Sequence, residues 1–456
     1  MKSVIRVAAV SLLAGCGSIL GIGDPRLLDA GGAGTDLDGG SQPQSFTLTV
    51  VASGGAVAAR SVTSGDGAID CGATCSHAYA GGTQVTLTAA AASGKGLAFQ
   101  TWAGDCAGSA NAPTCTLLMD QARNVSATFA PVNYVFISAA TFDASMGVLA
   151  GDTVCQTEAT ARGFPDASRY IAWLSDINAP AAGRIVAARG WVRLDGLPVL
   201  DSPNDVTRIL YPPRLGSLGQ DLTSVRVVTG TDAIGSSAAN CLNFTTNGSM
   251  QMAAVGQPGS GAGGWTDAGD TPCNGTDLHV YCFGTAAVSQ VVPPAVSGRL
   301  AFASDGTFNP STGRGMADAL CKGEATAGGL PGDYLALVSL IAEAASQRFD
   351  TTGPVWVRRD GVQLTTRPSD LFAGDGLVAA LDVTGTTRYL DHNDRIWTGS
   401  DKPNTAGMFE LSTCNDWSAP QGSGAVGVPD STAGFNYYHA QSLPCDTPHR
   451  VYCLQR

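Results

Sequence analysis

The amino-acid sequence predicts a multidomain, disulfide-bonded protein, in which a small all-β domain precedes two α+β modules. Three observations lead to this fold class: cysteines that fall into even sets, an internal duplication, and short alternating runs of Thr and Val bounded by glycine. The chain has 456 residues, which is enough for about three domains. Its abundant glycine (58 residues) and lack of long apolar helical patterns favour strand-rich domains.

The thirteen cysteines separate into one near the N-terminus and three sets of four. The last two sets have nearly equal spacings, of 86, 32 and 9 residues and then of 93, 31 and 8 residues, which indicates an internal duplication. Even sets of cysteines in an exported chain indicate disulfide bonds. Zinc binding is the alternative, and the absence of CxxC pairs within these two sets disfavours it. The two sets are Cys155, Cys241, Cys273 and Cys282, and Cys321, Cys414, Cys445 and Cys453.

The duplication extends to short motifs. Trp191-Val192-Arg193-Leu194-Asp195-Gly196 recurs as Trp356-Val357-Arg358-Arg359-Asp360-Gly361, and both copies close with a strand that ends in Val-Tyr-Cys. We therefore expect module 1 at residues 133–285 and module 2 at 298–456. Between them, residues 286–297 contain two consecutive prolines and are expected to form a short, stiff linker.

Each module is expected to open with a helix that carries its first cysteine. Glycines follow these helices, with Gly163 after the helix of Cys155 and Gly328 after that of Cys321. The Asp-Gly pairs predict hairpin turns. Core packing is the better interpretation of Trp191 and Trp356.

The first fifteen residues have the features of an export signal. A positive start with Lys2 and Arg6 precedes a short apolar run that ends in Leu13-Ala14-Gly15-Cys16. This ending resembles the lipobox of bacterial lipoproteins, and the resemblance implies that Cys16 is acylated and anchors the chain in a membrane through its lipid. The protein is then expected to be extracytoplasmic, at the outer membrane or cell surface. An ordinary signal peptide with an incidental cysteine is the alternative.

The charge and the N-terminal spacer fit this location. The formal charge is −12, and loss of Lys2 and Arg6 on cleavage would change it to −14. An acidic surface without a basic stripe argues against a nucleic-acid partner. Residues 16–44 contain the acylated Cys and a run rich in Gly and Asp, which we expect to be a disordered spacer.

Residues 45–131 alternate as strands do, for example in Phe46-Thr47-Leu48-Thr49-Val50. With Phe99 and Trp102 ahead of Cys106, this segment resembles a divergent bacterial B-repeat domain of the internalin type. The resemblance implies a small all-β fold with Phe99 and Trp102 in the core. It also implies the bridges Cys71–Cys75 and Cys106–Cys115. Such domains act as spacers or adhesive stalk units.

The order of elements and cysteines in the two modules resembles the C-type-lectin-like and endostatin superfamily. Within it, the modules are most similar to a lectin-like domain of unknown function found in bacterial lipoproteins. The sequence alone leaves three connectivities open for each set of four cysteines. The resemblance implies that the first cysteine pairs with the last and that the two middle ones pair with each other. The implied bridges are Cys155–Cys282 and Cys241–Cys273, then Cys321–Cys453 and Cys414–Cys445.

Sugar-binding members of that superfamily hold calcium with a Glu-Pro-Asn or Gln-Pro-Asp loop and a Trp-Asn-Asp strand. Module 2 has Lys402-Pro403-Asn404, which places an ammonium group where a carboxylate ligand would be needed. Module 1 lacks the Pro-Asn pair. We therefore expect no metal and no cofactor.

Long glycine-containing loops are the expected place for a ligand, because loops on rigid scaffolds tend to carry function. The candidate side chains are Trp265 in module 1 and Phe435, Tyr437 and Tyr438 in module 2. Aromatic rings in such loops can stack on sugars or dock a partner. The alternative is that they fold inward and cover a small core.

The sequence carries no recognised catalytic motif, such as HExxH, GxSxG or a P-loop, and no catalytic residue is assigned. The leading hypothesis is a lipid-anchored, non-catalytic surface protein of the cell envelope that binds a glycan or an envelope protein. A passive structural lipoprotein is the first alternative, and an envelope hydrolase is the second.

Overall fold

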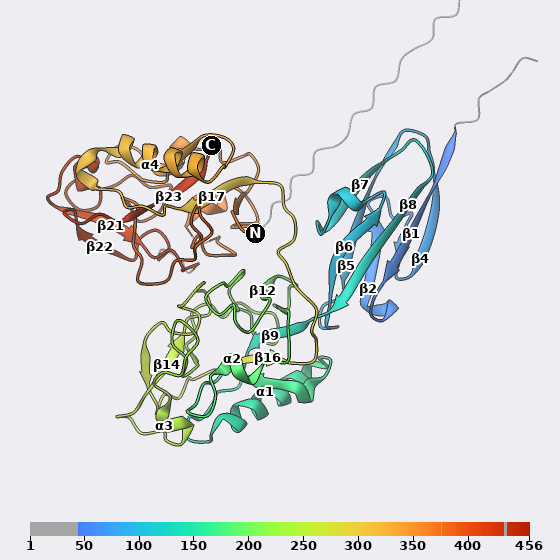
Figure 1. Ribbon diagram of the computed structural model, residues 1–456, viewed down its shortest axis with the longest axis horizontal. Coiled ribbons are helices and arrows are strands. Elements are labelled where there is room, and N and C mark those ends of the chain that lie inside the picture. Colours follow the sequence, from blue (N-terminus) through green and yellow to red (C-terminus); the bar gives the residue numbers. More distant parts are fainter. Residues whose placement is uncertain (1–43, 375, 433–435) are drawn as a thin grey trace, which may run out of the picture. The chain divides into compact units, whose positions relative to one another are not determined.

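The computed structural model describes residues 44–374, 376–432 and 436–456, and Figure 1 shows their arrangement. The architecture is mostly β, with several sheets, few helices and six disulfides. Residues Ser45–Arg456 form one compact unit. In these described ranges, no helix is long and apolar enough to cross a membrane. Cys16 and the spacer lie outside the described residues.

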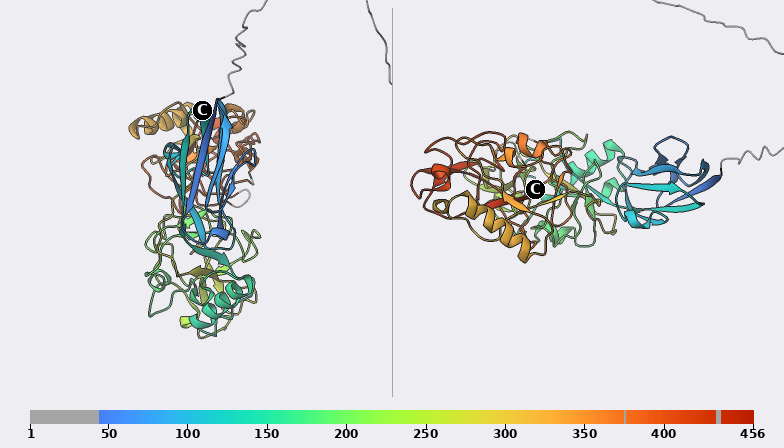
Figure 2. Two further views of the ribbon diagram at one scale, coloured as in Figure 1. Left: turned by 90° about the vertical axis from the view of Figure 1, so that its right-hand side faces the viewer. Right: turned by 90° about the horizontal axis from the view of Figure 1, so that it is seen from above.

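The N-terminal part is a sandwich of two four-stranded sheets, whose strands run side by side in Figure 2. Val85, Leu87 and Ala89 in one strand are buried while their neighbours are exposed, so the alternation of the sequence places one face of each sheet in the core. The first sheet has the order β4 (Thr74–Ala80), β1 (Ser45–Ser53), β8 (Arg123–Pro131) and β6 (Leu97–Gly104). The second has the order β3 (Asp70–Cys71), β2 (Arg60–Ser64), β5 (Thr83–Ala91) and β7 (Thr114–Met119).

Trp102 is buried in this sandwich, as predicted, whereas Phe99 is half-buried and packs at the edge of the core. The ring centroid of Phe99 lies 5.1 Å from that of Trp102. Disulfides join Cys71 to Cys75 and Cys106 to Cys115. Short 3-10 helices follow β1 and β6, at η1 (Val57–Ala59) and η2 (Ala107–Ser109).

Module 1 contains a five-stranded sheet and a three-stranded sheet. The larger sheet has the order β10 (Tyr170–Ala172), β16 (Tyr281–Gly284), β9 (Asn133–Ile137), β11 (Trp191–Val192) and β12 (Pro198–Leu200). The smaller has the order β13 (Val227–Val228), β14 (Met252–Gly256) and β15 (Asp270–Pro272). The helices are α1 (Val148–Arg162), η3 (Ala167–Arg169), α2 (Ala181–Arg184) and α3 (Cys241–Phe244).

Module 2 repeats this order with one seven-stranded sheet. Its path is β19 (Trp356–Arg358), β17 (Arg299–Ala303), β23 (Arg450–Gln455), β20 (Ile396–Trp397), β21 (Ser423–Gly427) and β22 (Gln441–Pro444), and β18 (Tyr334–Ala336) also pairs with β23. The helices are η4 (Pro310–Thr312), α4 (Arg314–Ala327), η5 (Ala345–Arg348), α5 (Asp370–Ala373) and α6 (Cys414–Trp417).

Each module opens with a strand, β9 or β17, and not with the predicted helix, because this strand pairs with the final strand of the module. The first long helix follows it and carries the first cysteine on its buried face, as predicted. Gly163 ends α1 in a left-handed conformation (φ 66°), which glycine adopts without steric cost. Disulfides then join Cys155 to Cys282 and Cys321 to Cys453, and the middle cysteines pair as Cys241–Cys273 and Cys414–Cys445. These are the pairs that the resemblance implied.

The tryptophans shared by the two copies, Trp191 and Trp356, begin the predicted hairpins and are fully buried. Trp191 Nε1 donates to the carbonyl oxygen of Gly284 (2.8 Å), and Trp356 Nε1 donates to that of Gln455 (3.0 Å). Both indole N–H groups are therefore satisfied inside an apolar environment, which supports the core interpretation.

Each module also contains a turn of left-handed helix that the sequence did not reveal. In α3, all four residues have φ between 53° and 62°, and in α6 all four lie between 50° and 62°. This conformation costs roughly 1–2 kcal/mol per L-residue, and Asn and Asp tolerate it best. Asn243 and Asp416 occupy the third position, where Oδ1 of each accepts the backbone N–H of Ile177 (2.9 Å) or Ile341 (2.7 Å).

We predict that Asp416→Ala lowers the free energy of unfolding by about 1–2 kcal/mol, because the Ile341 N–H loses its acceptor and alanine tolerates positive φ poorly. Asp416→Asn should restore most of that loss, since module 1 carries Asn at this position. Urea denaturation of the three proteins tests this. Equal loss in the Asn and Ala variants would contradict the assignment.

Candidate functional site

The aromatic side chains of the long loops lie inside the modules. Trp265, Tyr437 and Tyr438 are all 0% exposed, and Phe435 falls outside the described residues. Trp265 Nε1 donates to Val206 O (2.8 Å), and the Tyr438 hydroxyl donates to Leu337 O (3.1 Å). Tyr437 donates to Leu371 O. These three rings therefore offer no face to a ligand in this structure. They fold inward and cover a core, which is the alternative interpretation of the sequence.

The two long loops pack against each other. The Thr432 N–H donates to Gly259 O (2.8 Å), the Gly261 N–H donates to Asp430 O (2.5 Å), and Ser260 forms an antiparallel bridge with Ser431. The contact leaves no room for a side chain at two glycines of the module 1 loop. A Cβ at Gly261 would lie 2.2 Å from Asp382 Oδ2, and one at Gly264 would lie 2.4 Å from Asp430 Oδ2.

A buried charge cluster lies under this loop contact. Arg358, Asp382 and Asp430 are at most 1% exposed, and Arg358 contacts Asp382 and Asp360 at 2.6 Å each. Asp382 and Asp430 also accept the N–H groups of Ala262 and Gly264, both at 3.2 Å. The cluster therefore joins the modules, and its groups are enclosed by protein rather than open to a substrate.

Burial raises the pKa of Asp382 to about 6, although Arg358 acts in the opposite direction. The pKa of Asp430 is raised well above its usual range by burial, and then by the charges of Asp382 and Asp391. Burial also acts on Asp360, but Arg358 and the hydroxyl of Tyr389 hold its pKa below the usual value. The Arg358 guanidinium thus pairs with Asp360 and Asp382, while the charge of Asp382 acts on the buried Asp430, and the cluster is stabilised when it holds a proton.

The segment that the lectin resemblance singled out, Lys402-Pro403-Asn404, presents no cluster of ligands. The Lys402 N–H donates to Thr405 Oγ1 (3.1 Å), and Asp401 pairs with His439 (2.6 Å). Among the described residues, no group of three or more His, Cys, Asp and Glu side chains is placed to hold a metal ion.

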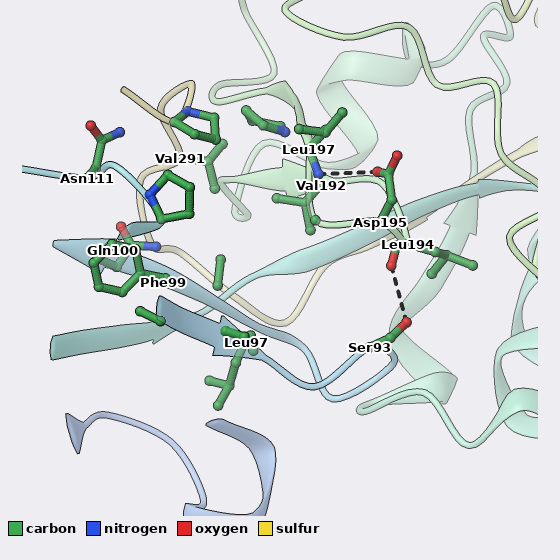
Figure 3. A pocket seen from close by; sticks show the side chains of 18 of the residues that line it. Ser93, Leu97, Phe99, Gln100, Asn111, Val192, Leu194, Asp195, Leu197 and Val291 are labelled. Carbon is green, nitrogen blue, oxygen red and sulfur yellow. Dashed lines mark hydrogen bonds between the residues drawn. The ribbon is translucent and has the colours of Figure 1, made fainter. Parts of the chain in front are cut away.

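A cleft of about 550 Å³ lies between the N-terminal sandwich and module 1, within the Ser45–Arg456 unit (Figure 3). Segments that are distant in the sequence line it, chiefly β5, β6 and their connection, the hairpin of β11 and β12, and the 286–297 linker, with Asn111, Pro113 and Tyr134. Figure 3 shows their side chains gathered around one space. The labelled apolar members are Leu97, Phe99, Val192, Leu194, Leu197 and Val291.

The polar groups at this cleft are few, and most serve the structure around it. Ser93 Oγ donates to Leu194 O (3.2 Å), and Asn111 Nδ2 donates to Pro293 O (2.7 Å). Asp195 pairs with Arg193 (2.5 Å) and accepts the Leu197 N–H. A mostly apolar cleft of this volume is typical of a binding site. Sequence reasoning missed it, because its lining is assembled from separate segments with no local motif.

Comparison with known families identifies the N-terminal sandwich. Residues 46–133 match the family model of the divergent InlB B-repeat domain. The match spans β1 to β8, so the B-repeat domain supplies one wall of the cleft. No curated protein matches the chain.

We predict that the charge cluster makes stability fall as the pH rises. A raised carboxyl pKa contributes stability that is present below the ordinary value of 3.8 and is lost as the pH rises through about 6. Asp430→Asn removes one ionisable group whose pKa is raised by burial, so the variant should equal the wild type at pH 3.5 and exceed it by about 1–3 kcal/mol at pH 8. Urea denaturation at both pH values measures this.

The surface acid Asp333, which is 51% exposed, provides the control. Asp333→Asn should show no such dependence on pH. An equal loss of stability by Asp430→Asn at both pH values would contradict the assignment of the cluster.

We also predict that neither calcium nor excess EDTA shifts the thermal midpoint of the protein, because the Lys402 ammonium stands where a ligand carboxylate would be needed. Differential scanning calorimetry checks this. A midpoint that rises with calcium concentration would reveal binding to the folded state.

Proposed function

We propose that this protein is a lipid-anchored, non-catalytic binding protein of the cell envelope that holds an apolar part of a protein partner in the cleft beside the B-repeat domain. The cleft carries the proposal because its volume, about 550 Å³, and its apolar lining suit a binding site. The modules, in this proposal, have a lectin-like scaffold.

A protein partner is favoured over a glycan. Sugars are bound by exposed aromatic faces together with several free hydrogen-bonding groups, or by calcium. The described loops keep Trp265, Tyr437 and Tyr438 inside, and the polar groups of Ser93 and Asn111 at the cleft already have partners in the chain. Leu194, Leu197 and Val292 leave an apolar lining that an aliphatic or aromatic side chain of a protein would fill.

The anchoring part of the proposal rests on the lipobox-like segment that ends in Cys16. Acylation there would hold the chain at a membrane, and the 16–44 spacer would separate the folded unit from it. The B-repeat match supports a surface role, since such domains serve as stalk or adhesive units.

The cleft is tested with Nile red, a neutral probe whose fluorescence rises in apolar sites. Val292 lines the cleft and is 46% exposed, so Val292→Gln should weaken probe binding about tenfold. Val288 lies in the same linker, is 68% exposed and does not line the cleft. Val288→Gln is therefore the matched control and should leave binding unchanged.

Equal probe binding by both variants would remove the cleft from the proposal. A glycan array, run with calcium and with chelator, separates the two partner classes. Glycan binding that Val292→Gln leaves intact would overturn the protein-partner assignment.

A further inference from the structure

A second surface, separate from the cleft, combines apolar exposure with backbone strain. Leu242, the second residue of α3, has φ 53° and is 63% exposed. Leucine is poorly suited to a left-handed conformation, and an exposed leucine gains nothing from burial. The fold alone therefore does not explain this residue.

Three more exposed apolar side chains belong to segments that contact α3. Met146, Leu149 and Ile177 are 66%, 75% and 78% exposed. The Gly147 N–H donates to Phe244 O (2.8 Å), and the Ile177 N–H donates to Asn243 Oδ1 (2.9 Å). In Figure 1, α3 lies beside one end of α1. We call Met146, Leu149, Ile177 and Leu242 the apolar patch.

Module 2 provides an internal comparison, since the same backbone contacts recur there. The Gly313 N–H donates to Trp417 O, and the Ile341 N–H donates to Asp416 Oδ1. These contacts align Met146 with Thr312, Leu149 with Gly315 and Leu242 with Asn415. The shared scaffold therefore folds with small or polar side chains at three of the four positions, so these three apolar side chains are particular to module 1, while module 2 exposes other apolar side chains such as Met316 and Phe409.

The patch is flanked by acids that module 2 also lacks. Asp143 and Asp176 align with Asn309 and Leu340. Hydrogen bonds from Ser145 lower the pKa of Asp143. Burial acts to raise the pKa of Asp176, but hydrogen bonds from Ala179 and Asn178 lower it overall. Arg184, whose charge also acts on Asp176, is held by Asp152 at 2.6 Å.

We propose that the apolar patch is a docking surface for a cationic amphipathic segment of a partner protein, whose apolar side chains cover Leu242 and its neighbours while its Lys or Arg side chains face Asp143 and Asp176. Complementary charge at the edge of an apolar contact sets the choice of partner. The same acids repel anionic lipid headgroups, which favours a protein over a membrane as the occupant. This proposal does not depend on the cleft.

The test measures fluorescence anisotropy of a synthetic amphipathic helix made of leucine and lysine, titrated with the full chain. The double variant Met146→Thr, Leu242→Asn carries the module 2 residues at these two positions. We expect it to bind the leucine–lysine helix about tenfold more weakly, or weaker still. A leucine–glutamate helix of the same pattern should also bind about tenfold more weakly than the leucine–lysine helix.

Two controls keep the result interpretable. Phe409 is an exposed apolar side chain of module 2 (58% exposed), and Phe409→Ser should leave binding unchanged. The thermal midpoint of the Met146→Thr, Leu242→Asn variant should equal or exceed that of the wild type, because asparagine tolerates the left-handed turn.

The proposal is overturned if the leucine–lysine helix does not bind, or if it binds the double variant and the wild type equally. Binding of neutral phosphatidylcholine vesicles in its place, lost in the double variant, would assign the patch to a membrane and overturn the protein partner.

Discussion

The disulfide bond between the first long helix and the final strand is the constraint on which each module depends. Cys155 in α1 is joined to Cys282 in β16, and Cys321 in α4 is joined to Cys453 in β23. The final strand lies inside its sheet, where β16 pairs with β9 and β10. The bridges span 127 and 132 residues, and closing so long a loop stabilises a module by about 4–5 kcal/mol in the chain-entropy model. The long, irregular segments between helix and strand are tolerated because their two ends are fixed.

The duplication separates what the scaffold requires from what each copy adds. Both copies keep an ion pair between the long helix and a short helix that follows it, Asp152–Arg184 and Asp318–Arg348, each at 2.6 Å. They differ at the loop contact, where module 2 supplies Asp382 and Asp430 and module 1 supplies glycines. The two copies share one fold, and they contact each other through acids in module 2 and glycines in module 1. Surfaces outside this contact differ between the copies, as Leu242 and the aligned Asn415 show.

Much of the fold could be predicted from the sequence, because it is encoded locally. The helix around Cys155 ends at Gly163, the Asp-Gly turn after Trp191 forms a hairpin, and the family match at residues 46–133 agrees with the predicted B-repeat segment. The positions of the candidate ligand rings could not be predicted in this way. A glycine-rich loop is compatible with an exposed or a buried Trp265, and the acceptor that satisfies its indole N–H, Val206 O, is distant in the sequence. The cleft and the left-handed turns also depend on contacts between distant segments.

The nested order of the bridges has a consequence for how the chain matures. As a module emerges N-terminus first, Cys155 meets Cys241 and Cys273 before Cys282 is available, yet its partner is Cys282. Pairing in order of appearance would give the wrong bonds, and these must be exchanged through mixed disulfides before β16 can enter its sheet. A catalyst of disulfide exchange would therefore speed the maturation of each module.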